Sequence, residues 1–430
     1  MNSYFIGLDI GTSSVKGVLR SVNGKIEAKA NEKFHYYIKD NIKLHDADEF
    51  CNICFYAIKQ LVEKLPEDGK IEGLCCSGAS GNLVIMENDQ KVCPIYGWQN
   101  IMDSSITEPV MEQFPNEEVY LKVGWQKIDQ MPLAVLAYLH QVDPEKICRA
   151  YKICMHIEYL NYKLTNQWGI TTSMGTPFYL IDQEKAQYNQ KMLSVLEINE
   201  KQLPPIKPTC SKLGGITSWA GEKTGLEEGT PVVLGTFDHP SAARGAGVFD
   251  TDQLMLSCGT SWVAFKPFKT RKQVEERKMM IDPFLSPNGN YAGMKSLDSV
   301  SELIDANIYK YLGNISYQEF DKLSEKSTSG ANGFSVGQLA DNYKPEDIAR
   351  GIMEDVAKQL KHMLESMKDN SKEIRIVGGI TNSKIFLQVI REITGRNIKV
   401  VNGETAGAVG SAIMAGIGTG YYSDEKNAVL

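Results

Sequence analysis

The stretch LDIGTSSVKGVL, residues 8–19, is the most informative part of the sequence. It places one carboxylate, Asp9, and a Gly-Thr-Ser-Ser turn between two apolar runs that are typical of buried strands. A second stretch, LMLSCGTSWVAF at 254–265, has the same outline, but Cys258 precedes its glycine and it carries no acid. Because each stretch leads into alternating strands and helices, we predict two related α/β domains, each with one Gly-Thr turn.

The bulk composition limits the partners and the compartment. A chain of 430 residues is too long for a single core, and its net charge of −7 favours neither nucleic acid nor an anionic membrane as partner. Asp9 interrupts the first apolar run, so we expect no targeting peptide. The small-residue stretch 406–420 is too short for a membrane span and predicts a closely packed helix. The cysteines lie in apolar surroundings, which indicates buried free thiols and a cytoplasmic protein.

Periodicity predicts the main elements. Cys51 and Cys54 form a C-x-x-C, but helical spacing places Cys54 on an apolar face, which favours a core position over a redox or metal site. We expect a mostly helical region over 106–205. The other expected elements are helices over 47–65 and 349–367, and strands over 71–78, 374–377 and 398–401.

The two turns have the composition of phosphate-binding loops. Glycine lets a ligand approach the backbone, and successive N–H groups in a tight turn form an anion site. Hydroxyls add donors, so the candidates are Gly11, Thr12, Ser13, Ser14, Gly259, Thr260 and Ser261. An acid beside phosphates needs a cation between them, so Asp9 is a candidate ligand of Mg²⁺. Both turns are also ordinary hairpin connections, and that reading stays open.

Two further motifs each have two readings. In FDHPSAARGAG (237–247), Asp238 follows an apolar strand and precedes a helix start, so it is either a general base or a helix cap. GGITNS (378–383) either lets a nucleotide approach the backbone or is a plain turn from strand to helix.

Taken in order, these motifs resemble the FGGY carbohydrate kinases, the group of glycerol kinase, xylulokinase and fuculokinase. LDIGTSSVK and LMLSCGTSWVAF are similar to the two phosphate motifs, and TPVVLGTFDHPSAARGAG to the stretch with the catalytic base. The resemblance implies two actin-like or ribonuclease H-like domains around an interdomain cleft, over 1–245 and 246–430. The first domain would carry a helical insertion at about 106–205.

The resemblance also implies the site. Asp238 would be the general base, Asp9 would hold Mg²⁺, and a small sugar or polyol would be phosphorylated by ATP. The residues implied to bind ATP are Gly11, Thr12, Ser13, Ser14, Lys16, Gly259, Thr260, Ser261, Gly378, Gly379 and Asn382. Those implied to bind the sugar are Ser80, Gly81, Asn82, Trp98, Gln99, Asn100, Asp238 and His239. Each sugar contact has a structural alternative, since a Trp beside a Gly is more often part of a core.

The sequence departs from the family at two places. Ile380 stands where the family's adenosine loop has a third glycine, and residues 330–350 replace a loop rich in Pro and Arg. The sugar is therefore unassigned, and a homodimer is left open. The alternatives are a catalytically weak member that binds sugar or nucleotide, and an ATPase that activates a partner enzyme.

Overall fold

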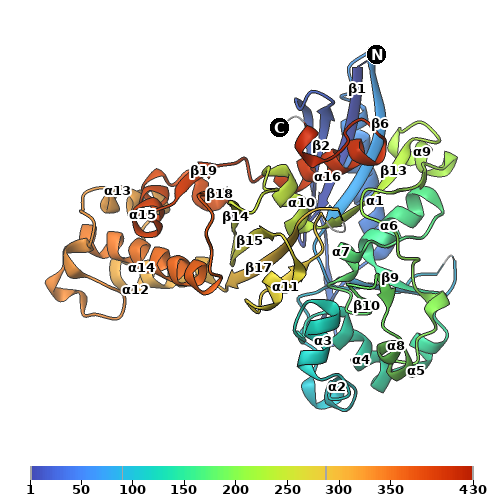
Figure 1. Ribbon diagram of the computed structural model, residues 1–430, viewed down its shortest axis with the longest axis horizontal. Helices are drawn as coiled ribbons and strands as arrows, with labels where there is room; N and C mark the ends of the chain where they lie inside the picture. Colours follow the sequence, from blue (N-terminus) through green and yellow to red (C-terminus); the bar gives the residue numbers. More distant parts are fainter. Residues whose placement is uncertain (1, 90, 286–287, 429–430) are drawn as a thin grey trace. The chain divides into compact units, whose positions relative to one another are not determined.

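A computed structural model describes residues 2–89, 91–285 and 288–428, and the chain divides into two compact units. Unit 1 comprises Met1–Gly247, Ile281–Phe284 and Thr405–Leu430, and unit 2 comprises Val248–Met280 and Leu285–Glu404. Each unit is built around a six-stranded sheet with helices (Figure 1). The predicted α/β class with two sheet-containing domains is confirmed, and the division at residue 245 stays a prediction.

The main sheet of unit 1 has the order β12-β13-β6-β1-β2-β3. Strand β1 is antiparallel to β2 and parallel to β6, and β6 is parallel to β13. The carboxyl ends of β1, β6 and β13 therefore lie at the same edge of the sheet. The strands are β1 (Asn2–Ile10), β2 (Ser14–Ser21), β3 (Ile26–Lys33), β6 (Gly69–Gly78), β12 (Lys212–Gly215) and β13 (Pro231–Phe237).

A second sheet of unit 1 has the order β4-β5-β8-β7-β9, and β10 pairs with β11. These strands are β4 (Tyr37–Lys39), β5 (Ile42–His45), β7 (Leu83–Met86), β8 (Ile95–Tyr96), β9 (Lys152–Met155), β10 (Ile181–Asp182) and β11 (Gln187–Tyr188). The helices of the unit are α1 (Ala47–Val62), α2 (Ser104–Met111), α3 (Asn116–Val123), α4 (Pro132–Val142), α5 (Pro144–Cys148), α6 (His156–Thr165), α7 (Thr172–Gly175), α8 (Gln190–Val195), α9 (Ser218–Thr224), α10 (Asp238–Gly245) and α16 (Ala406–Gly418). The region 106–205 is largely helical, as expected, but it also contains the short strands β9–β11.

Helix α1 explains the C-x-x-C pair. Asp46 caps the helix by accepting hydrogen bonds from the N–H groups of Asp48 and Glu49 at 3.0 and 2.8 Å. Cys51 and Cys54 are 1% and 0% exposed, so both belong to the core. The core position predicted for this pair is confirmed, whereas Cys148 is exposed and Cys210 is half-buried.

Helix α16 packs at backbone distance against β1 and α10 (Figure 1). A Cβ added to Gly7 would lie 2.0 Å from the carbonyl oxygen of Ala408, and one added to Gly410 would lie 1.8 Å from that of Ser241. Only glycine allows this approach, so the predicted close packing is confirmed. No helix within the described part of the chain has the length and apolar character needed to span a membrane.

The sheet of unit 2 has the order β16-β17-β15-β14-β18-β19 and repeats the pairing of the first sheet. Strand β14 is antiparallel to β15 and parallel to β18, just as β1 is antiparallel to β2 and parallel to β6. The strands are β14 (Gln253–Cys258), β15 (Trp262–Phe268), β16 (Met280–Asp282), β17 (Tyr291–Leu297), β18 (Glu373–Gly378) and β19 (Asn397–Val400). The two stretches with Gly-Thr turns therefore occupy equivalent positions in two similar sheets.

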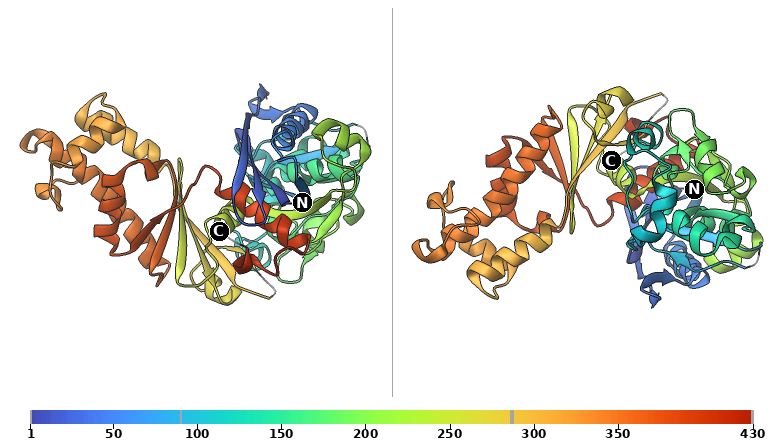
Figure 2. Two further views of the ribbon diagram at one scale, coloured as in Figure 1. Left: turned by 90° about the horizontal axis from the view of Figure 1, so that it is seen from above. Right: turned by 90° about the horizontal axis from the view of Figure 1, so that it is seen from below.

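Helices α12–α15 gather on one face of the second sheet (Figure 2). The helices of this unit are α11 (Arg271–Glu275), α12 (Val300–Leu312), α13 (Tyr317–Ser324), α14 (Pro345–Ser366) and α15 (Lys384–Thr394). Five short 3₁₀ helices complete the described elements: η1 (Glu200–Gln202), η2 (Ala331–Gly333), η3 (Ala340–Asn342), η4 (Gly379–Asn382) and η5 (Glu425–Asn427).

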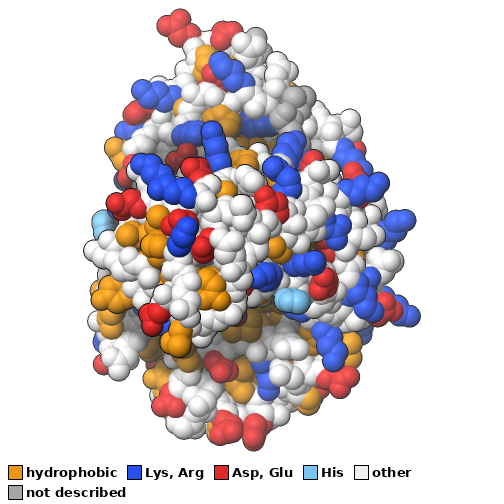
Figure 3. Space-filling model, turned by 90° about the vertical axis from the view of Figure 1, so that its left-hand side faces the viewer, with side chains coloured by type: hydrophobic (Ala, Val, Ile, Leu, Met, Phe, Trp, Pro, Cys, Tyr) orange, Lys and Arg blue, Asp and Glu red, His pale blue; other side chains and the backbone are white. Residues whose placement is uncertain are grey.

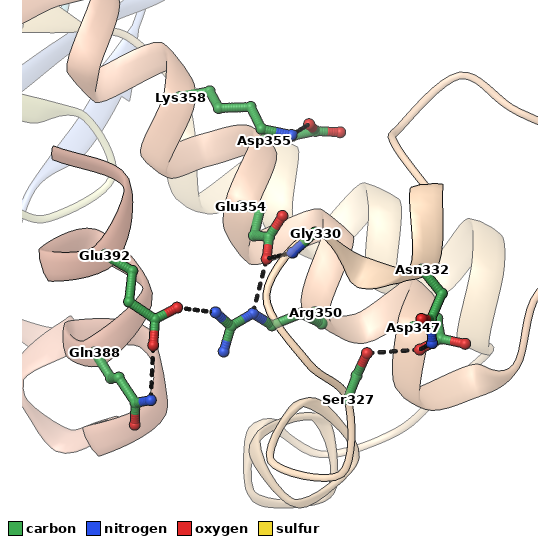
Figure 4. Close-up of polar contacts among 10 residues, drawn as sticks. All are labelled: Ser327, Gly330, Asn332, Asp347, Arg350, Glu354, Asp355, Lys358, Gln388 and Glu392. Atoms are coloured by element: carbon green, nitrogen blue, oxygen red, sulfur yellow. Dashed lines mark hydrogen bonds and ion pairs between the residues drawn. The ribbon is translucent and has the colours of Figure 1, made fainter.

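The loop that replaces the Pro- and Arg-rich segment is fixed to α14 by buried polar contacts (Figure 4). Arg350, 2% exposed, donates from Nε to Glu354 Oε1 at 2.9 Å and also pairs with Glu392 of α15. The same Glu354 oxygen accepts the backbone N–H of Gly330 at 2.9 Å. The guanidinium thus links α14 to α15, and Glu354 links both to the loop, so removing Arg350 would take away the cationic partner of the buried Glu354 carboxylate.

Charged side chains of both signs are interspersed over the face shown in Figure 3. That face carries no continuous basic surface, which agrees with the net charge of −7.

Candidate active site

The first hairpin of unit 1 forms a three-residue turn, Gly11–Ser13, between β1 and β2. The N–H of Gly11 donates to the carbonyl oxygen of Ser14 at 2.9 Å and closes the turn. Thr12 and Ser14 are half-buried, and Ser13 is exposed. The turn therefore presents hydroxyl and backbone donors at the edge of the sheet where β1 ends.

Asp9 lies next to the end of β1, with its Cα paired to that of Lys16 on β2. Burial raises the pKa of the Asp9 carboxyl to about 7, the charge of Asp238 acts in the same direction, and Lys16 opposes both. Asp9 also packs on α16, since a Cβ added to Gly407 would lie 2.3 Å from its Oδ2. Two carboxylates that repel each other, with Lys16 of β2 opposite Asp9, form an arrangement that a cation would stabilise.

Asp238 is the first residue of α10 and directly follows β13. Its Oδ1 accepts the N–H of His239 at 2.8 Å. The cap position of α10 is Phe237, so Asp238 stands one residue inside the helix, where its charge also favours the helix N-terminus. The ring of His239 lies edge-on to Phe237 with centroids 6.4 Å apart.

The loop after β6, which contains Ser80, Gly81 and Asn82, comes to the same sheet edge as Asp9 and Asp238. Asn82 is 7% exposed and its Oδ1 accepts the backbone N–H of Trp98 at 2.9 Å. The indole Nε1 of Trp98 donates to Thr12 Oγ1 at 2.8 Å. The structure thus joins this loop, the Trp98 segment and the first turn, three parts of the sequence that the candidate site requires together.

The other residues of the Trp98 segment have different surroundings. Gln99 is exposed, and its Oε1 accepts a hydrogen bond from Lys43 Nζ at 2.7 Å. Asn100 is buried and uses its whole amide on backbone groups: Oδ1 accepts from the N–H of Lys43, and Nδ2 donates to the carbonyl oxygens of Lys43 and Gly97. These bonds favour a structural role for Asn100, and its contact with sugar stays a prediction.

The second hairpin, in unit 2, has a turn of the same length, Gly259–Ser261. The N–H of Gly259 donates to the carbonyl oxygen of Ser261 at 3.2 Å, and Ser301 of α12 donates to the carbonyl oxygens of Thr260 and Gly259 at 3.1 and 2.9 Å. Gly259 and Thr260 are exposed. Ser301 of α12 therefore holds the backbone of the turn, while Gly259 and Thr260 remain exposed to solvent.

A cavity of about 530 Å³ adjoins this second turn. Its lining combines the two glycine-containing loops of unit 2 with apolar and polar side chains of the surrounding helices: Gly259, Gly379, Ile380, Asn382, Trp262, Ile304, Phe320, Phe386, Tyr317 and Asp321. Gly378 ends β18, and Gly379 and Asn382 bound the 3₁₀ helix that follows. The volume and the mixed lining suit a small flat molecule with polar substituents.

The glycines of the two turns are not required by the backbone. A Cβ added to Gly11 would lie 3.4 Å from the nearest atom, and one added to Gly259 would lie 3.8 Å away, both ordinary contacts. Gly378 differs, since its φ is 105° and a Cβ there would lie 2.2 Å from the carbonyl oxygen of Cys258. The space above Gly11 and Gly259 therefore fits close approach of a ligand such as a phosphate group.

Two features of the site were missed in the sequence. His45, at the end of β5, lies in the same small hollow as Thr12 and Asn82. In unit 2, Asp321 accepts a hydrogen bond from Ser383 Oγ at 2.8 Å at the wall of the larger cavity. Neither residue belongs to a glycine-rich or acidic motif, so no local pattern indicated it.

Comparison with known proteins identifies the class. Residues 4–245 match the model of the FGGY family of carbohydrate kinases, N-terminal domain, and residues 323–419 match that of the C-terminal domain. The chain belongs to the FGGY family of carbohydrate kinases and is a sugar kinase.

Individual relatives are distant but similar along nearly their whole length. A probable L-xylulose kinase of Haemophilus influenzae is 24% identical over 459 residues, covering 96% of this chain and 90% of that protein. A gluconokinase of Bacillus licheniformis is 22% identical, covering 98% and 88%. Among solved structures, xylulose kinase from Rhodospirillum rubrum has a TM-score of 0.88 at 20% identity, covering 99% and 91%. Plasmodium falciparum glycerol kinase with ADP has a TM-score of 0.87 at 18% identity, with the same coverage. The likeness confirms the actin-like fold that the motif order implied.

Proposed function

We propose that this kinase transfers the γ-phosphate of ATP to a hydroxyl of a small ketose or polyol, with Asp238 as general base. The observation that carries the proposal is the meeting of Asp9, Asp238 and the Ser80–Asn82 loop at one edge of the unit 1 sheet. Ligands of α/β folds bind at the carboxyl ends of parallel strands, and this edge joins two acids to a hydroxyl-rich turn.

In this reaction the sugar hydroxyl gives its proton to the Asp238 carboxylate while its oxygen forms a bond to the γ-phosphorus. The bond from that phosphorus to the β-phosphate oxygen breaks, and ADP leaves. Most of the catalysis in such transfers comes from positioning and charge stabilisation. Half-burial of Asp238 and its hydrogen bond from His239 hold the carboxylate in one orientation.

The glycine turn of each unit, taken by itself, is a candidate phosphate-binding loop for the nucleotide. The donors to phosphate oxygens are the backbone N–H of Thr12 with Ser13, Ser14 and Lys16 in unit 1, and Gly259, Thr260 and Ser261 in unit 2. The cavity beside Gly379 and Asn382 has the size and lining for the nucleoside. ADP in the structure of the Plasmodium falciparum relative supports this nucleotide class.

Mg²⁺ fits the acid pair. The raised pKa of Asp9 reflects burial and repulsion from Asp238, and a divalent cation would relieve both. Among the described residues no group of three or more His, Cys, Asp or Glu could hold a metal, so phosphate oxygens and water would complete the set around Asp9. When bound, Mg²⁺ neutralises charge on the phosphates. The cysteines are free thiols, which supports a cytoplasmic location.

A coupled ADP-release assay with D-xylulose, L-xylulose, gluconate and glycerol tests the proposal. We expect at least one of these sugars or polyols to raise ADP release far above the sugar-free rate, and gluconate to be a poor substrate. A chain that binds nucleotide but shows no stimulation by any related sugar would contradict the proposal and favour a non-catalytic member of the family.

A further inference from the structure

A small hollow beside the first turn of unit 1 has an unusual set of polar groups. Its volume is about 10 Å³, room for one water-sized group. The lining includes the polar residues Thr12, His45 and Asn82 together with the apolar side chains of Phe34, Phe50 and Ile95. A space this small holds one polar group and excludes a longer segment of a carbon chain.

The imidazole of His45 can only accept a hydrogen bond in this hollow. Its Nδ1 lies 2.8 Å from the carbonyl oxygen of His35, so Nδ1 carries the proton. His45 is 7% exposed, and burial lowers its pKa, which keeps the ring neutral. Within residues 2–89, 91–285 and 288–428, no group hydrogen-bonds to Nε2. The lone pair of Nε2 is therefore available to a ligand.

The other two polar groups are complementary to that acceptor. Asn82 Oδ1 accepts the N–H of Trp98 at 2.9 Å, which fixes the amide orientation and leaves Nδ2 as a donor. Thr12 Oγ1 accepts the indole N–H of Trp98 at 2.8 Å, so its own proton is free to be donated. One acceptor and two donors around room for a single oxygen match a hydroxyl group, which both donates and accepts.

We infer that this hollow binds a terminal hydroxyl of the sugar other than the phosphorylated one, with His45 Nε2 as its acceptor and Asn82 Nδ2 as its donor. The inference rests on the proposed function and adds the substrate class. A carboxylate has no proton to give to Nε2, so the hollow selects neutral ketoses and polyols over sugar acids. His45 is thus a substrate-binding residue that takes no part in the proton transfer at Asp238.

Two substitutions at His45 distinguish the loss of the Nε2 hydrogen-bond acceptor from the loss of the packing of the ring. In His45→Asn the amide nitrogen replaces Nδ1 and keeps the bond to His35, but the acceptor at Nε2 is lost. In His45→Gln the amide reaches the position of Nε2 and can restore it. Both variants lose the edge-on contact with Phe34, whose ring centroid lies 6.5 Å away, so a loss of packing affects them equally.

The test compares D-xylulose with 1-deoxy-D-xylulose, which lacks the terminal hydroxyl at C1, in the ADP-release assay. We expect His45→Asn to raise the KM for D-xylulose roughly threefold to tenfold, the worth of one hydrogen bond, with kcat and the KM for ATP within twofold. Wild type should show a similar penalty for the deoxy sugar, and this penalty should disappear in His45→Asn. His45→Gln should recover most of the wild-type KM.

The outcomes are distinguishable from those for the proposed function. If wild type is active and the deoxy penalty is equal in wild type and His45→Asn, the assignment of the hollow is overturned while the kinase reaction stands. Equal loss in both His45 variants, with a lowered thermal midpoint, would likewise overturn it in favour of ring packing. If no sugar stimulates ADP release and titration calorimetry detects no sugar binding, both proposals fail together.

Discussion

The two glycine turns have the same length and the same strand pairing but differ in the chemistry beside them. Each joins two antiparallel strands by three residues, and in each the first strand has a parallel neighbour on its other side. Asp9 stands two residues before the first glycine, whereas Cys258, buried and 4% exposed, directly precedes the second. The first turn is tied to the Trp98 segment and the second to α12. Under the proposed function, both turns would bind phosphate, while the acid beside the turn belongs to unit 1.

The largest effect expected from this comparison concerns the acid. Asp9→Asn keeps the shape that packs against Gly407 but removes the charge, so we expect the Mg²⁺ concentration for half-maximal turnover to rise at least tenfold. A magnesium titration of the initial rate measures it. Cys258→Ser, in the second hairpin, should leave the half-saturating Mg²⁺ concentration unchanged. An unchanged magnesium titration in Asp9→Asn would contradict the proposed difference between the two hairpins.

The two turn glycines provide a test of what the hairpins share. Gly11→Ala and Gly259→Ala both have room for the added methyl group, so we expect thermal midpoints within about 2 °C of wild type. If phosphate contacts both turns closely, each substitution should raise the KM for ATP by roughly tenfold. Gly378→Ala serves as the contrast, because its positive φ and backbone clash predict lost stability. If only one of the two substitutions raised the KM for ATP, the idea that both turns bind phosphate would be contradicted.

The smallest expected effect concerns Glu158, a second acid of unit 1 whose pKa is raised, as that of Asp9 is. Burial raises the pKa of Glu158, 2% exposed on α6, to about 8. Its value in the unfolded chain is about 4.5, so folding takes up a proton between pH 4.5 and pH 8, and this cost increases as pH rises. Glu158→Gln removes the cost and should raise the thermal midpoint by a few degrees at pH 8 relative to wild type, with little difference at pH 4.5.

Thermal unfolding of both proteins across pH 4.5–8.5 measures that difference, and the magnesium titration of Glu158→Gln should match wild type. A midpoint difference independent of pH would contradict the protonated state of Glu158 in the folded protein.

Much of the fold could be predicted because the hairpins carry their own signals. Apolar runs on both sides of the turn glycines indicated both strand pairs, and the small residues of 406–420 indicated a closely packed helix. The strands β9–β11 were missed because they have two to four residues, too few for a period to be visible.

The site was only partly predictable. Asp9 lies near the end of β1 and Asp238 follows β13, and the carboxyl ends of these strands share an edge, so their approach could be inferred from motif order. Asn100 has the side chain of a sugar ligand, yet its bonds to the backbone of Lys43 depend on a strand 57 residues earlier. His45 depends in the same way on His35 and Asn82, and sequence patterns contain no information on such contacts.

The most direct test of the central assignment is Asp238→Asn, followed by rapid quench of phosphoryl transfer at saturating ATP and sugar. We predict loss of at least roughly 10²-fold in the transfer rate, the usual contribution of a positioned base, with ATP affinity by calorimetry within twofold of wild type. Transfer within fivefold of the wild-type rate would contradict the role of Asp238 as the general base.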